Sequence, residues 1–292
     1  IASLFSKRRR SYVCVLNDLE DAGYFYHDLV QLTGGDGIYF FPSAYRRAIK
    51  YGHVDPANEI LRTEVLSTLQ DPTAPFIIVT YPEALAEKVI SREVLKENTL
   101  KISVGEKLDN MFVSDVLDEY GFEQVDYVYE PGQYAMRGSI LDVFSFSYEF
   151  PYRIDFFGNE VETIRSFDVE TQLSKEKLDS IYIVPEMSKN AKDSTSLLGS
   201  LPRNTFIAAR DLAWCKERIG SVWNDDPVVA DEESFADIDQ MRKKLVQAED
   251  FLREVLDFRR IHFGARPMGT ADATIHFSTQ TQPIYHKNFD RE

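Results

Sequence analysis

The first hundred residues alternate short apolar runs with longer segments of helical periodicity, and this alternation restricts the fold more than any other feature of the chain. Apolar runs at residues 11–16, 37–42 and 75–80 predict three buried strands. Segments at 18–32 and 57–69 repeat their apolar residues at helical spacing, so each lies between two of these strands. Strands that alternate with helices in this way form a parallel sheet covered by helices on both faces.

The alternation stops near Thr99. A helix is predicted at 107–121, and long β segments joined by short turns follow it as far as about residue 185. One of the turns is Gly158-Asn159, a residue pair typical of a two-residue hairpin loop. This middle block therefore predicts one helix with an antiparallel sheet.

Strand and helix patterns resume at 204–223, whose strand could complete the first sheet. A long charged helical run is predicted at 232–264 and a final strand at 273–285. A chain of 292 residues with 43% hydrophobic residues is long enough for two cores. We therefore predict an α/β chain in which a parallel-sheet domain, formed by 1–97 and 186–292, carries an inserted α+β domain at 98–185 with an antiparallel sheet.

Charge and cysteine content bear on partners and compartment. The formal net charge is −15, and a chain this acidic binds nucleic acid poorly unless its basic residues gather on one face. The densest basic run, KRRR at 7–10, has no second cluster in the sequence to extend it, so we expect a solvated edge. The only cysteines, Cys14 and Cys215, stand in apolar surroundings, which is typical of a reducing cytoplasm. No apolar run is long enough to span a bilayer, so we expect a cytoplasmic protein without a membrane partner.

The sequence contains none of the common catalytic signatures. A P-loop needs glycines followed by Lys and Ser or Thr, and the only glycine cluster, TGGDG at 33–37, lacks the Lys and leads into a strand, which favours an ordinary loop. There is no GxGxxG string, no nucleophile elbow and no pair of metal-ligand residues at the usual spacing. The histidines are His27, His53, His262, His276 and His286. We expect no enzyme activity, no cofactor and no metal in this chain.

An unusual residue order marks the strand before the Gly158-Asn159 turn. One face of this strand is apolar and is expected to be buried; its members are Tyr152, Ile154 and Phe156. The other face places Phe157 beside Arg153 and Asp155, where water is expected. Phe157 could be tucked under the turn, or it could be the aromatic anchor of a binding surface that also contains arginine and hydrogen-bonding groups.

The arginines on this segment suit a binding surface. A guanidinium presents a rigid fork of donors to a partner's carboxylates, and Asp155 could hold the fork of Arg153 in place. Arg137 could reach the same face if the preceding β segments pair, and Gly138 beside it would allow a bulge or a close approach of the backbone.

The middle block carries motifs of a known family. They are an Arg-Gly step at Arg137-Gly138, the strand ILDVF at 140–144, the strand RIDFF at 153–157, and Phe167-Asp168 followed by Thr171-Gln172. This pattern closely resembles the N-terminal region of the bacterial transcription-repair coupling factors (the Mfd family) and, more distantly, the matching region of the excision-repair protein UvrB. The match is dense in this block, whereas outside it the order of elements agrees better than the residues do.

The resemblance implies a module that copies the first two domains of UvrB. A degenerate, helicase-like (RecA-like) domain would carry an inserted domain that docks onto UvrA. The coupling factors lack the P-loop that UvrB has in its first half, and so does this chain. The family's docking arginines and phenylalanine fall on Arg137, Arg153 and Phe157; we add Asp155 and Arg165 from the same hairpin. Whether Arg165 and Glu162 join the contact is left open by the sequence.

The resemblance also implies regions outside this chain that bind RNA polymerase and form an ATP- and Mg-dependent motor on DNA. We therefore expect a non-catalytic module that recruits UvrA in transcription-coupled repair. The alternative is a UvrB-like helicase fragment that binds DNA and senses damage, and the missing P-loop and the net charge of −15 argue against it.

Overall fold

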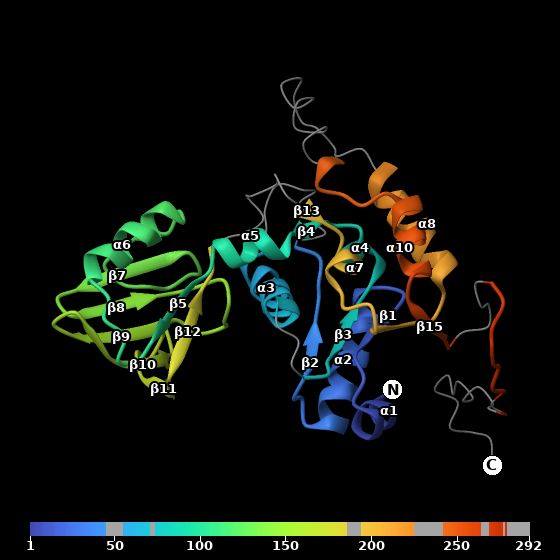
Figure 1. The fold of residues 1–292 in the computed structure, drawn as a ribbon, viewed down its shortest axis with the longest axis horizontal. Coiled ribbons are helices and arrows are strands. Elements are labelled where there is room, and N and C mark those ends of the chain that lie inside the picture. The colour runs from blue at the N-terminus through green and yellow to red at the C-terminus, as the bar shows by residue number, and fades with distance from the viewer. Residues whose placement is uncertain are drawn as a thin grey trace, which may run out of the picture.

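Two sheets of different kinds organise the chain (Figure 1). The computed structural model describes residues 1–44, 55–70, 74–185, 194–224, 242–263, 269–276 and 278. Within these residues a five-stranded parallel sheet and a six-stranded sheet, antiparallel except for one parallel pair at its edge, are accompanied by two small strand pairs. Figure 1 shows the antiparallel unit on one side and the parallel unit on the other, with α3 (Pro56–Gln70) and α5 (Arg92–Glu97) between them.

The parallel sheet is assembled from both ends of the sequence. Its strands, in spatial order, are β15 (Arg259–His262), β14 (Phe206–Ala209), β1 (Tyr12–Val15), β3 (Ile77–Thr80) and β2 (Ile38–Phe40). The central strand β1 pairs in parallel with β3 on one side and with β14 on the other. The predicted α/β architecture with a parallel sheet is thus confirmed, while the helicase-like assignment stays a prediction.

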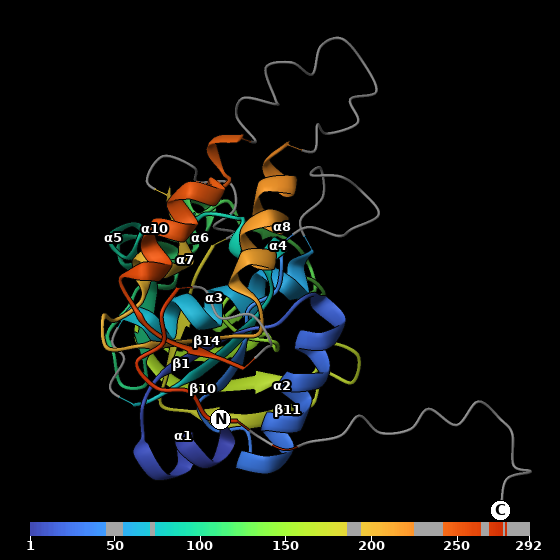
Figure 2. The same cartoon turned by 90° about the vertical axis from the view of Figure 1, so that its right-hand side faces the viewer.

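Helices surround this sheet, and those at 19–33, 56–70 and 212–224 lie where the sequence periodicity predicts them. Besides α3 and α5 they are α1 (Ala2–Arg8), α2 (Leu19–Thr33), α4 (Pro82–Leu85), α7 (Leu197–Ser200), α8 (Leu212–Asn224) and α10 (Ala248–Leu256). Helix α8 packs against α4 and α10, whereas α2 and α3 contact β2. Helix α1 lies at one end of the unit and α8 and α10 at the other (Figures 1 and 2).

Two predictions for the second half of the chain are wrong within the described residues. The charged run at 232–264 is not one helix, because α10 ends at Leu256 and residues 259–262 form the edge strand β15; residues 225–241 lie outside the described part. Residues 273–276, expected to start a final strand, are not in a strand, and most of 277–285 lies outside the described part.

The antiparallel unit has one core face and one outward face. Its sheet runs in the order β11 (Ser174–Leu178), β10 (Glu160–Phe167), β9 (Tyr152–Phe157), β8 (Ile140–Val143), β7 (Gln133–Arg137) and β6 (Glu123–Gln124). Helix α6 (Asn110–Glu119) covers the core face, where its Val113 and Leu117 share a buried cluster with Leu141 and Ile154. Burial of these apolar side chains is the main driving force for the packing.

The chain enters and leaves this unit through neighbouring strands. β5 (Leu100–Ser103) pairs in antiparallel fashion with β12 (Ser180–Ile183), and β4 (Val89–Ile90) pairs with β13 (Ser194–Thr195) nearby. The predicted domain boundaries, 98 and 185, stay a prediction.

A small apolar cluster joins the two units. Ile60 of α3 packs with Val128, Ala135 and Phe144 of the antiparallel unit. Ala135 and Phe144 belong to the outward face of the sheet, because their strand positions alternate with those of the core residues. One end of the outward face is therefore closed by α3, and its other end is open.

The fold extends the basic run at residues 7–10. The guanidinium carbon of Arg10 lies 5.3 Å from the centre of the Phe206 ring, and that of Arg259 lies 5.8 Å from the same ring centre. Phe206 starts β14, between the strands that Arg10 precedes and Arg259 begins. Residues 7–10 are all exposed, so the expected solvated edge is confirmed, and the fold adds Arg259 beside it.

Candidate partner-binding site

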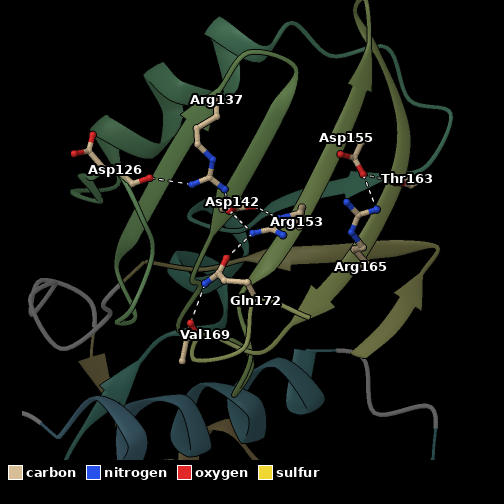
Figure 3. A network of polar contacts seen from close by, with 9 residues as sticks. All are labelled: Asp126, Arg137, Asp142, Arg153, Asp155, Thr163, Arg165, Val169 and Gln172. Atoms are coloured by element: carbon tan, nitrogen blue, oxygen red, sulfur yellow. Dashed lines mark hydrogen bonds and ion pairs between the residues drawn. The ribbon is translucent and has the colours of Figure 1, made fainter. Parts of the chain in front are cut away.

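The open end of the outward face carries the predicted site residues. We call it the arginine face, and its members are Arg137, Asp142, Arg153, Asp155, Phe157, Thr163, Arg165 and Gln172; Figure 3 shows all of them except Phe157. Strands β7, β8, β9 and β10 supply all of them except Gln172, which follows β10. The structure thus brings together all five residues predicted to bind a partner.

The alternation predicted for β9 is confirmed. Tyr152, Ile154 and Phe156 are buried, while the side chain of Phe157 is 79% exposed. Phe157 pairs with Glu160 across the Gly158-Asn159 loop, in which Gly158 has a φ of 65°. The explanation that Phe157 is tucked under this turn is therefore wrong.

Asp142 is the central acceptor of the arginine face, and the sequence analysis did not single it out. Nε of Arg153 donates to Oδ1 of Asp142 at 2.6 Å, and Nη2 of Arg153 donates to Oδ2 at 2.8 Å. Nη2 of Arg137 donates to Oδ2 of the same carboxylate (Figure 3). The available signal was the lone acidic residue inside the apolar strand ILDVF, because a buried carboxylate needs a cationic partner.

The expectation that Asp155 holds Arg153 is wrong. Register explains this, because Asp142 lies directly opposite Arg153 in the β8–β9 pair. Asp155 lies two residues farther along β9 and pairs with Arg165, whose Nη1 is 2.9 Å from Oδ2 of Asp155. Oγ1 of Thr163 donates to the same oxygen at 2.7 Å. The face therefore contains two separate arginine–aspartate groups.

The loop after β10 adds a further contact to Arg153. Nη2 of Arg153 donates to Oε1 of Gln172 at 2.9 Å, and Nε2 of Gln172 donates to the carbonyl of Val169 at 2.8 Å. Gln172 has a φ of 60°, which is uncommon for a residue with a Cβ. The guanidinium carbon of Arg153 also lies 4.2 Å from the ring centre of the buried Phe167. Arg153 is therefore fixed from several sides.

Arg137 is held at the edge of the same face. Its Nη1 donates to the carbonyl of Asp126 at 2.9 Å, and its guanidinium carbon lies 5.1 Å from the ring centre of the exposed Tyr127. The expectation that Gly138 allows a bulge or a close backbone approach is wrong, since no atom lies within 4 Å of a Cβ placed there and the β7–β8 register is regular. Gly138 instead supplies a φ of 62° in the two-residue loop between β7 and β8, a conformation that glycine adopts without strain.

The arginine face gathers three arginines on a chain whose net charge is negative. Three arginines share two aspartates, although the formal net charge of the whole chain is −15. Hydrogen bonding to Asp142 raises the pKa of Arg153 above its ordinary value, so the guanidinium stays charged. Charged arginines beside an exposed aromatic ring suit a partner that presents carboxylates next to an apolar pocket.

Other parts of the described chain are weaker candidates for a functional site. TGGDG forms the loop between α2 and β2, as predicted. The amino end of α2 is capped by the carboxylate of Asp18, and Glu20 and Asp21 occupy its first turn, where a bound phosphate would meet negative charge. Burial raises the pKa of the Cys14 and Cys215 thiols to about 12, which keeps them protonated.

None of the helices among the described residues is both long and apolar enough to cross a bilayer. No three His, Cys, Asp or Glu side chains in the same part of the chain gather as metal ligands. His53 and His286 lie outside the described residues.

Comparisons with known proteins agree with the motifs. Residues 100–188 match the family model of the UvrB interaction domain. The chain is 28% identical over 213 residues to the transcription-repair-coupling factor of Escherichia coli (strain K12), a match that covers 72% of this chain and 18% of that protein. It is 30% identical over 203 residues to the Myxococcus xanthus factor, covering 67% of this chain and 17% of that protein. The Bacillus subtilis (strain 168) factor is 29% identical over 184 residues, with 63% and 16% covered.

The chain therefore spans less than a fifth of the length of these relatives. The matched domain contains the whole arginine face, from Arg137 to Gln172. The predicted relationship is confirmed: the chain carries a UvrB interaction domain at residues 100–188 and is related to the transcription-repair-coupling factors.

Proposed function

We propose that this chain is a non-catalytic module that recruits the excision-repair protein UvrA by presenting the arginine face, as UvrB would. The observation that carries the proposal is Phe157, a large aromatic side chain that is 79% exposed on a face with three arginines, inside a UvrB interaction domain. Exposed aromatic and arginine side chains dominate the binding energy of many protein interfaces.

The expected energies are sufficient for a specific complex. Truncation of an aromatic anchor typically costs about 2 kcal/mol or more, and a charge-assisted hydrogen bond contributes about 1.5–3 kcal/mol. Because about 1.4 kcal/mol corresponds to a tenfold change in affinity, loss of Arg153 and Phe157 together would weaken a micromolar complex beyond detection.

In this proposal the parallel-sheet unit holds the binding domain in place and binds no nucleotide itself. The acidic first turn of α2 disfavours a nucleotide phosphate. We accordingly propose that this chain binds no cofactor, and that ATP and Mg act in a motor region outside it. We also propose that the full-length protein binds RNA polymerase and DNA and that it is cytoplasmic.

Calorimetric titration of the chain with purified UvrA tests this function. The parent is compared with the double change Arg153→Ala and Phe157→Ala, after circular dichroism has shown that the variant is folded. Binding by the parent alone supports the proposal. Equal binding by both proteins places the contact elsewhere, and no binding by either rejects UvrA as the partner.

A second candidate function is contact with duplex DNA, and one observation favours it. Arg10 and Arg259 flank the Phe206 ring, and the run at 7–10 lies beside them, so basic side chains gather at one end of the parallel sheet. Phosphate contacts of this kind make affinity fall steeply with salt. A fluorescence-anisotropy titration with duplex DNA at several salt concentrations tests it, with Arg10→Ala/Arg259→Ala as the variant; binding that ignores salt, or that the variant retains, rejects it.

A further inference from the structure

We infer that Asp142 is a positioning residue for partner binding: it holds Arg137 and Arg153 in fixed orientations before the partner arrives, and it leaves a defined edge of Arg153 free. The inference rests on the proposed function, because it assigns how the same face is prepared for UvrA.

The burial of Asp142 is the first argument. Its side chain is 1% exposed, whereas the side chains of Arg153 and Arg137 are 14% and 35% exposed. Asp142 therefore cannot touch a partner directly, and it acts through the two guanidinium groups that cover it. It lies on the outward face of β8, opposite Arg153 on β9 and Ala135 on β7.

The second argument is the pattern of donors that remain. A guanidinium has five N–H groups, and Asp142 and Gln172 use the one on Nε and both on Nη2 of Arg153. Among the described residues, no acceptor is bonded to either N–H of Nη1. The edge of Arg153 formed by Nε and Nη2 is thus closed to a partner carboxylate, and Nη1 is the atom that is available to it.

The third argument is that Arg153 is also restrained from the loop side. Gln172 accepts from Arg153 while its own backbone has a φ of 60°, a conformation that costs free energy for a residue with a Cβ. Its side-chain amide is in turn fixed by the Val169 carbonyl. A strained residue directed at one guanidinium indicates that the orientation of that guanidinium matters.

Stability alone is a weaker explanation of this arrangement. Replacing a buried ion pair by well-packed apolar residues is often neutral or stabilising, so the fold by itself does not require Asp142. The carboxylate fixes the rotamers of Arg153 and Arg137 when the chain folds. Less side-chain conformational entropy is therefore lost when the partner binds.

The main test is the affinity of the chain for UvrA, measured by calorimetry for the parent and for Asp142→Asn. The asparagine keeps the shape of the side chain and removes its charge. We expect a loss of affinity of about tenfold or more, because two guanidinium groups lose a charged acceptor. The matched control is Asp257→Asn, which breaks an exposed pair with Arg203 on the parallel-sheet unit and is expected to leave the affinity unchanged.

A double-mutant comparison separates positioning from a general effect on the fold. In an Arg153→Ala chain, the further change Asp142→Asn should weaken binding clearly less than it does in the parent, because one of the groups it positions is gone. An equal loss in both backgrounds would overturn the inference. Equal affinities of the parent and Asp142→Asn for UvrA would also overturn the inference, but would not contradict the proposed function. Absence of binding by the parent would reject the proposed function itself.

A measurement on the free parent chain covers the case in which Asp142→Asn does not fold. Proton exchange of the arginine Nε–H groups can be followed by nuclear magnetic resonance. We expect the Nε–H of Arg153, which donates to Asp142, to exchange with water more slowly than the Nε–H of the exposed Arg203. Equal exchange rates would show that Arg153 is not held in advance, and would overturn the inference whatever the variants do.

Discussion

Arg165 lies directly opposite Arg153 in the β9–β10 pair, yet the two guanidinium groups are directed to different aspartates. Like charges directly opposite each other destabilise an antiparallel pair. Here Asp142 of β8 neutralises Arg153 on one side, and Asp155 neutralises Arg165 farther along β9. This division allows several arginines to stand side by side on one sheet face.

The change Asp155→Asn should therefore expose the repulsion between Arg153 and Arg165. Since the Asp155 and Arg165 side chains are partly exposed, we expect a modest decrease of about 0.5–1 kcal/mol in the free energy of unfolding, measured by urea denaturation. Salt should reduce the loss by screening the two cations. A decrease of the same size at high salt would contradict the electrostatic explanation.

The change Phe157→Ala should separate binding from stability. The side chain is exposed, so the free energy of unfolding should stay within about 0.5 kcal/mol of the parent value, while UvrA affinity falls by about thirtyfold. The neighbouring Phe156 is buried and serves as the matched control: Phe156→Ala should lower the free energy of unfolding by about 3–5 kcal/mol. A strongly destabilised Phe157→Ala chain would refute the proposed role of this side chain.

The change Arg153→Lys should not preserve function. A lysine ammonium cannot bond both oxygens of Asp142 through two parallel N–H groups and also reach Gln172. We expect a loss of UvrA affinity of about tenfold or more in calorimetry. Arg203→Lys, at an exposed ion pair, should behave like the parent, and a fully active Arg153→Lys chain would show that charge alone suffices.

The two thiols should be inert in the native chain. Burial raises the pKa of Cys14 and Cys215 to about 12, so neither thiolate forms near neutral pH. Iodoacetamide should label both cysteines only after unfolding, as mass spectrometry would show. Between the ordinary thiol pKa of 9.0 and about 12, the thiols ionise only in the unfolded chain. The free energy of unfolding should therefore fall as pH rises through that interval. Rapid labelling of the native chain would contradict this burial.

The sequence pattern predicts the parallel sheet well and its last strand poorly. Strands covered on both faces consist almost entirely of apolar residues, as in β1 and β3, and such runs are easy to recognise. Strand β15 has the sequence RRIH, follows an amphipathic helix closely and lies at the edge of the sheet. Its strand conformation depends on pairing with β14, a long-range contact that no local pattern reports.

For the arginine face, alternation predicts which residues share a side but not which of them pair. Phe157, Arg153 and Asp155 are placed correctly because their side-chain direction depends only on position along one strand. The partner of Arg153 depends on the register between β8 and β9, which selects Asp142 instead. The positive φ of Gln172 is likewise a property of the folded loop. Binding of UvrA by these residues stays a prediction.

The pairing of β5 with β12 has a practical consequence for protein engineering. Leu100 and Ile183, near the two ends of the matched domain, are partners in adjacent strands. Adjacent strands lie about 4.8 Å apart, so a host protein needs to open only one surface loop to accept the whole segment between them. The UvrB interaction domain is therefore suited to transplantation into an unrelated scaffold, provided that the host covers Val128, Ala135 and Phe144, which Ile60 contacts here.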